Sequence, residues 1–141
     1  MNQALLRQVW ARAKRRCEYC HLPAIAYPLP FHIDHIVARQ HGGTSDINNL
    51  ALACLHCNRH KGPNIAGKDP LTGQTIRLYD PRQDSWDDHF RWRGAELSGL
   101  TPVGRVTIRV LAVNAEDFAA VRESLMVEGI FQASTADVST G

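Results

Sequence analysis

Four cysteines occur as two pairs, Cys17/Cys20 and Cys54/Cys57, with two residues inside each pair. Zinc is held tetrahedrally by thiolates, and a two-residue gap lets neighbouring sulfurs reach one ion. Two such pairs supply every ligand of a zinc ion and leave no open position for a substrate. The cysteines therefore predict a structural zinc site, which holds the fold and carries out no reaction.

The segment between and just after these pairs carries harder ligands. His32, Asp34 and His35 precede the second pair, and Asn58 directly follows it. Oxygen and imidazole donors suit a divalent cation that keeps part of its water. A reaction is therefore expected at these residues. The remaining histidines near the cysteines are interpreted as surface residues or as neighbours of the ligands: His21, His41 and His56.

The order of short motifs across residues 17 to 62 resembles the HNH endonuclease motif. The matching fragments are Asp34-His35-Ile36, Gly42-Gly43, Asn48-Asn49-Leu50 and Cys54-x-x-Cys57-Asn58-x-x-Lys61-Gly62. Members of this family use a ββα-metal finger and hydrolyse phosphodiester bonds in DNA with one divalent metal. The resemblance therefore implies an α+β fold built on that finger, preceded by a helix and followed by an extension.

The resemblance also implies roles for single residues. His35 corresponds to the general base that takes a proton from water, a task suited to a neutral imidazole near pH 7. Asp34 and Asn58 correspond to ligands of the catalytic cation, and His32 is a candidate further ligand or phosphate contact. Asn58 stands where many members have His, and its harder donor favours Mg²⁺ or Mn²⁺ over Zn²⁺. Asn49 corresponds to a residue whose amide braces the loop and keeps His35 aimed.

The cysteine pairs resemble the zinc-binding subset of the family. Because 33 residues separate Cys20 from Cys54, the zinc site is expected to enclose the whole hairpin. Within that hairpin Asp34 and His35 are neighbours, and neighbouring side chains of a regular strand point to opposite faces. Both can face one phosphate only if the strand ends or twists there, which we expect.

Apolar and turn-forming residues predict the elements that hold these ligands. A strand is expected at residues 31–37, and the Gly-, Asn- and Ser-rich residues 38–49 are expected to form a long functional loop. A second strand at 50–53 and a helix at 54–61 follow, and Gly62 ends the helix. The predicted order is strand, loop, strand, helix.

Residues 3–16 predict a basic amphipathic helix, with Leu6, Val9, Trp10 and Ala13 on one face. Contacts to phosphate position a protein without reading sequence, so low sequence specificity for DNA is expected. The expected phosphate contacts are Arg12, Lys14, Arg15, Arg16 and Lys61.

Residues 64–141 are expected to form an α+β extension packed on the core of residues 1–63. The alternation of Val106, Ile108 and Val110 with polar neighbours favours a strand there. The acidic residues between Asp80 and Asp88 lack the spacing of metal ligands. The expected elements are strands at 75–78 and 103–113, a helix at 115–128 and a polar tail at 133–141.

Composition limits the class of protein. With 141 residues, 44% of them hydrophobic, the chain fits one domain. No stretch approaches the roughly 20 apolar residues of a membrane span, and no signal-peptide layout precedes residue 8, so a cytoplasmic protein with reduced cysteines is expected. The net charge of +2 divides into +5 for residues 1–62 and −3 for residues 63–141. A basic half that also holds the ligands suggests a polyanionic partner, although a solvated charged face is the alternative.

Two functions follow from these observations. The first is a metal-dependent HNH endonuclease with a structural Zn²⁺ and a catalytic Mg²⁺ or Mn²⁺. The second is a zinc-stabilised module that binds nucleic acid without cleaving it. The joint presence of Asp34, His35, Asn49 and Asn58 favours the enzyme, because a binding module has no need for all four.

Overall fold

The computed structural model describes residues 1–131, and the predicted tail at 133–141 lies outside them. The chain is mixed α/β, with small two-stranded antiparallel sheets. The helices are α1 (Gln3–Arg12), α2 (Leu55–Lys61), α3 (Trp86–His89), α4 (Pro102–Val110) and α5 (Glu116–Val127). The strands are β1 (His32–His35), β2 (Leu50–Ala53), β3 (Ala66–Lys68), β4 (Thr75–Arg77), β5 (Phe90–Arg93) and β6 (Glu96–Gly99). No helix in residues 1–131 is long and apolar enough to cross a membrane.

Helix α1 begins and ends for local reasons. The Asn2 side chain caps it by accepting the Leu5 N–H at 2.7 Å. The helix ends before residue 16, the predicted end, because Lys14 and Arg15 adopt left-handed backbone angles, with φ of 56° and 58°. Such angles cost a side-chain-bearing residue about 1 kcal/mol each. The turn they make directs the chain into the first cysteine pair.

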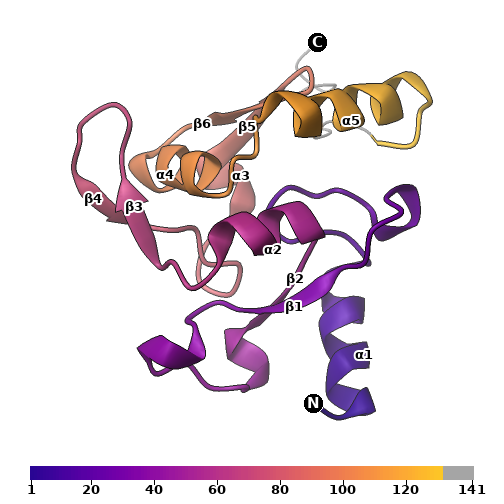
Figure 1. The fold of residues 1–141 in the computed structure, drawn as a ribbon, viewed down its shortest axis with the longest axis vertical. Coiled ribbons are helices and arrows are strands. Elements are labelled where there is room, and N and C mark those ends of the chain that lie inside the picture. Colours follow the sequence, from indigo (N-terminus) through magenta and orange to yellow (C-terminus); the bar gives the residue numbers. More distant parts are fainter. Residues whose placement is uncertain (132–141) are drawn as a thin grey trace.

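Strands β1 and β2 form the hairpin that carries the expected active-site residues. His35 pairs with Leu50, and Asp34 pairs with Ala51. Leu50 and Leu52 pack with Val9 of α1 in one apolar cluster. Ala51 and Ala53 instead belong to the cluster that contains the cysteines. The hairpin therefore has one face toward α1 and the other toward α2, as the arrangement in Figure 1 shows.

The loop between these strands depends on two glycines. Gly42 has a φ of +92°, which favours glycine. A Cβ on Gly43 would lie 1.7 Å from the Val37 carbonyl oxygen and 2.9 Å from the Asn49 side chain. The loop also contains two single 3₁₀ turns, Arg39–His41 and Ile47–Asn49. The loop is thus compact and closely packed against its own backbone.

The extension differs from prediction at residues 103–113. This segment is not a strand: residues 102–110 form helix α4. Thr101 caps the helix by accepting the Gly104 N–H at 3.1 Å, and Pro102 occupies its first turn, where proline is favoured. Val103, Val106 and Val110 also fit helical spacing, so the capping residues decide between the two interpretations. The predicted helix at 115–128 is confirmed as α5.

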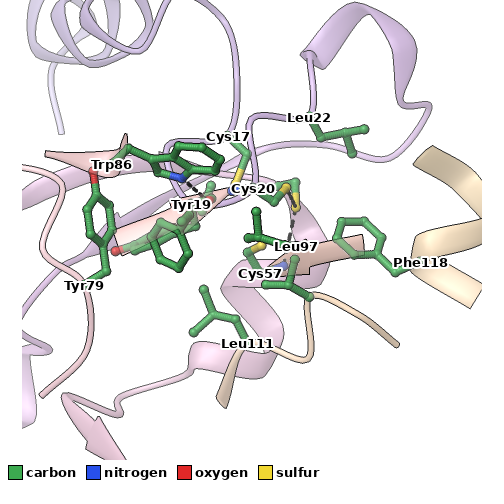
Figure 2. Packing of buried hydrophobic residues seen from close by; sticks show 14 of the residues in the cluster. Cys17, Tyr19, Cys20, Leu22, Cys57, Tyr79, Trp86, Leu97, Leu111 and Phe118 are labelled. Carbon is green, nitrogen blue, oxygen red and sulfur yellow. Dashed lines mark hydrogen bonds between the residues drawn. The ribbon is translucent and has the colours of Figure 1, made fainter. Parts of the chain in front are cut away.

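Residues of the extension and all four cysteines share one buried cluster. Figure 2 shows the sulfurs of Cys17, Cys20 and Cys57 surrounded by Trp86, Leu97, Leu111 and Phe118. An ion pair also joins the extension to residues 1–63, because Arg82 pairs with Glu18. The Glu18 carboxylate in turn accepts the Leu52 N–H at 2.8 Å.

Candidate functional site

The cysteines converge on one point inside the protein. Their four sulfurs lie within 4.8 Å of one another, and all four residues are buried. The Cys20 and Cys54 sulfurs are 3.8 Å apart. A tetrahedral zinc with bonds of about 2.3 Å requires sulfurs about 3.8 Å apart, so this separation fits the ion. The four cysteines could therefore hold a zinc ion, as their spacing predicts.

Backbone geometry supports the same site. The Cys20 N–H donates to the Cys17 sulfur at 3.5 Å, and the Cys57 N–H donates to the Cys54 sulfur at 3.4 Å. Both pairs thus form the same tight turn, in which an amide stabilises the charge of a thiolate. Cys54 has a second task, because its sulfur is also the N-cap of α2.

His35 lies at the end of β1, on the face of the hairpin toward α1. Its Nε2 is 3.0 Å from the Ser45 Oγ, and the Arg39 guanidinium donates to the same oxygen at 2.7 Å. Ser45 and Arg39 belong to the loop, and nothing in the sequence indicates this contact except that Ser45 is of a turn-forming type. The Ser45 hydroxyl, itself bonded to Arg39, therefore holds the Nε2 edge of the imidazole.

The Asn49 side chain spans the two ends of the loop. Its Oδ1 accepts the Val37 N–H at 2.9 Å, and its Nδ2 donates to the carbonyls of Val37 and Thr44 at 3.0 and 2.7 Å. These bonds use both hydrogens of the amide nitrogen and one lone pair of its oxygen. Residues 37–49 are therefore closed by Asn49 into a unit that carries Ser45 toward His35.

Asp34 faces the opposite side of the hairpin from His35 and is only 4% exposed. Its Oδ2 accepts the Tyr19 hydroxyl at 2.7 Å, and its Oδ1 accepts the Lys61 ammonium at 3.2 Å. Burial raises the pKa of the Asp34 carboxyl, against the opposing effects of Lys61 and Tyr19. The strand does end at His35, yet the pleat through Asp34 remains regular, so the two side chains do not converge.

Lys61 was expected to contact phosphate, and the structure contradicts this. The residue is 1% exposed, because its side chain runs under the hairpin. Besides Asp34, its ammonium donates to the carbonyls of His35 and Ile36, both at 3.1 Å. All three ammonium hydrogens therefore have internal acceptors. Lys61 braces the backbone of His35 instead of reaching solvent.

The expected ligands of a catalytic cation lie on the α2 side of the hairpin. Asn58 is half-buried and precedes Lys61 by three residues, so both project from the same side of α2. His32 shares the face of Asp34, and its Nε2 is buried without a hydrogen-bond partner in the described chain. These donors fit Mg²⁺ or Mn²⁺ in kind. Within residues 1–131, however, only the four cysteines form a cluster of three or more His, Cys, Asp or Glu ligands.

The basic residues around α1 divide into two groups. Arg12 donates to the carbonyls of Ile47 and Leu50 at 3.0 and 2.6 Å and so ties α1 to the loop. Arg15 lies over the Trp10 ring, 5.0 Å from its centroid. A surface hollow of about 630 Å³ follows this helix, lined by Gln3, Leu6, Arg7, Trp10, Ala11 and Arg15. The exposed basic side chains around it are Arg7, Lys14, Arg15 and Arg16.

The three histidines interpreted as neighbours of the ligands have separate positions. His21 stacks on Trp86 with centroids 4.1 Å apart, and burial lowers its pKa to about 4. His56 stacks on Phe118 at 3.9 Å. His41 is exposed in the loop. These histidines therefore support packing or face solvent.

Comparison with known proteins identifies one segment. Residues 17–64 match the family model of the HNH endonuclease, which spans both cysteine pairs, the hairpin and α2. No curated protein matches the chain.

Proposed function

We propose that this chain, whose residues 17–64 match the family model of the HNH endonuclease, is a metal-dependent enzyme that hydrolyses phosphodiester bonds in DNA. The observation that carries the proposal is His35, half-buried on a hairpin whose loop is closed by Asn49 and whose backbone is braced by Lys61. An imidazole held in this way is suited to proton transfer. The hairpin and α2 would then be the ββα-metal finger of the family.

In this proposal His35 is the general base. The tautomer with hydrogen on Nε2 donates to Ser45 Oγ, which has a second lone pair for Arg39. Nδ1 then keeps its lone pair and takes the proton of the attacking water. The imidazolium that forms keeps its bond to Ser45, so the ring does not turn during the transfer. Asn49 acts through the loop and is a positioning residue.

The cation is the part of the proposal that rests on the resemblance. Asp34 and Asn58 would hold Mg²⁺ or Mn²⁺, with His32 as a candidate third donor, on the side of the hairpin opposite to the His35 side chain. The proposal therefore requires β1 to twist when DNA binds, so that the ion and the imidazole reach the same phosphate. Such an ion supplies positive charge to the scissile phosphate and the leaving oxygen. Lys61 already neutralises Asp34, so a cation that binds this carboxylate must compete with the ammonium.

Purified protein incubated with supercoiled plasmid tests the proposal. Nicked or linear plasmid is expected with Mg²⁺ or Mn²⁺, and none without an added divalent cation. Tight DNA binding with no cleavage under any divalent cation would contradict the proposal and favour the non-catalytic binding module. The contact between His35 and Ser45 favours the nuclease over the non-catalytic binding module, because a binding module has no need to fix an imidazole.

Ser45→Ala is expected to lower kcat about tenfold with little change in KM, because one hydrogen bond of about 1 to 1.5 kcal/mol to the base is lost. Ser45→Thr keeps the hydroxyl and should restore most of the rate. Thr44→Ala, which removes a hydroxyl from the same loop without touching His35, is the control. Equal rates for Ser45→Ala and Thr44→Ala would show that the contact does not serve the reaction.

Arg7→Ala combined with Arg15→Ala is expected to weaken DNA binding and to reduce the slope of log affinity against log salt by about 2, since each lost phosphate contact removes about 0.9. Fluorescence anisotropy with a labelled duplex measures this. Arg91→Ala combined with Arg93→Ala removes the same charge from exposed positions on β5 and should leave the slope nearly unchanged. The same loss in both double variants would mean that net charge, not the surface of α1, governs binding.

A further inference from the structure

Helix α5 buries a complete guanidinium group. Arg122 is 0% exposed, and its Nε and one terminal nitrogen both donate to the Ala95 carbonyl, at 2.9 and 2.8 Å. Its Cζ lies 5.2 Å from the Trp92 ring centroid and 5.1 Å from that of Phe118. The other terminal nitrogen, Nη1, is buried and has no hydrogen-bond partner in the described chain.

Within residues 1–131, no carboxylate forms an ion pair with this cation. Five ion pairs occur within residues 1–131, and none of them includes Arg122. Burial of an unpaired charge costs several kcal/mol, and two aromatic faces together return only about 1 to 4 kcal/mol of this. A buried arginine of this kind therefore needs a negative charge from another source.

A chain of ring contacts joins Arg122 to the cysteine cluster. Phe118 lies one turn before Arg122 on α5 and stacks on His56 with centroids 3.9 Å apart, and His56 adjoins Cys57. Figure 2 shows the Phe118 ring turned toward the sulfurs. Burial lowers the pKa of Arg122, while the thiols of Cys20, Cys57 and Cys54 act in the opposite direction. The guanidinium is thus within electrostatic reach of three cysteines.

We propose that Arg122 is the counter-charge of the zinc tetrathiolate, and that the extension is attached to the finger through this charge. Four thiolates on one Zn²⁺ carry a net charge of about −2. Phe118 and Trp92 cover the guanidinium and keep water from it, which strengthens the attraction. The extension then contributes to metal affinity although it supplies no ligand.

The charge relation predicts how loss of the guanidinium changes zinc binding. With zinc bound, Arg122→Met loses an attraction and should weaken zinc binding about 10- to 100-fold, the range found for groups just outside a metal's ligands. Arg122→Met should therefore also lower the melting temperature of the zinc-loaded protein.

Competition with a chromophoric zinc chelator on the full chain measures the affinity change. Arg122→Lys keeps the charge and should keep most of the affinity. Arg105→Met is the matched control, because Arg105 is an arginine of the extension whose partner is a carboxylate, Asp69, at 2.8 Å. These readouts concern zinc alone, so they do not depend on nuclease activity.

Two results would overturn the proposal. One is unchanged zinc affinity in Arg122→Met. The other is an equal loss in Arg122→Met and Arg122→Lys, which indicates packing rather than charge. If the metal-free protein is unfolded, Co²⁺ replaces zinc as the readout: the thiolate-to-cobalt absorption band should shift in Arg122→Met and remain in place in Arg105→Met. An unshifted band in Arg122→Met would contradict the proposal equally.

Discussion

His35→Ala is expected to reduce plasmid cleavage by about 10² to 10⁴, the contribution typical of a general base, while the protein keeps its fold and its zinc. The fold should survive because His35 is only half-buried and its side chain bonds to Ser45 alone. Initial rates of plasmid nicking, together with the melting temperature and zinc content of the same preparation, measure both parts of this expectation.

The control is His41→Ala, which removes an exposed imidazole from the same loop. It should cut at nearly the parent rate. Cleavage by His35→Ala at the parent rate would contradict the assignment of His35 as the general base. Asp34→Ala is a poor test of cation binding, because it leaves the buried Lys61 ammonium without its carboxylate and should destabilise the fold by about 3 to 5 kcal/mol.

Cys54→Ser is expected to abolish both the fold of the finger and the activity. Structural zinc contributes about 10 to 16 kcal/mol of apparent binding free energy, as much as or more than the roughly 5 to 15 kcal/mol by which a whole domain is stable. Cys54 also caps α2, but serine is a good N-cap, so the substitution isolates the loss of the ligand. Zinc content and far-ultraviolet circular dichroism measure the outcome.

Removal of zinc from the parent with a chelator should reproduce the unfolding, and added Zn²⁺ should reverse it. Cys54→His offers a donor that zinc also accepts and should retain part of the metal. A Cys54→Ser protein that melts at the parent temperature without metal would show that the cysteines are only an apolar core.

Local rules predicted the β1–β2 hairpin and helix α2 well. Two cysteine pairs, a glycine pair and an apolar run fix the order of hairpin and helix, and strand β2 occupies its predicted residues 50–53. These features depend on residues close in sequence, whose turns and spacing can be read directly.

The extension was harder to predict. At residues 102–110 apolar alternation and helical spacing are both satisfied, and the cap at Thr101 decides. Strands β5 and β6 were missed, because Phe90 and Trp92 are buried by partners distant in sequence, Phe131 among them. The spacing of residues within a short segment does not show which distant residues will bury it.

The site shows the same limit. Lys61 has the sequence appearance of a solvated residue at the end of a helix, yet it is buried, because Asp34 and two backbone carbonyls supply its acceptors. Ser45, the hydrogen-bond partner of His35, was predicted only to be a turn-forming residue of the loop. Which face of β1 each side chain occupies depends on the register with β2, which places Asp34 beside Ala51.

Helix α2 is held at both ends, and it therefore connects the zinc site to the backbone support of His35. Its first residue follows Cys54 at the zinc site, and its last residue, Lys61, is bonded to the carbonyl of His35. Seven residues of helix span roughly 10 Å, a length over which a helix transmits displacement as a rigid rod. A shift of the metal-bound end would therefore move the support of the imidazole at the other end. The position of the metal-bound end of α2 can thus affect His35 without contact between the ion and the substrate.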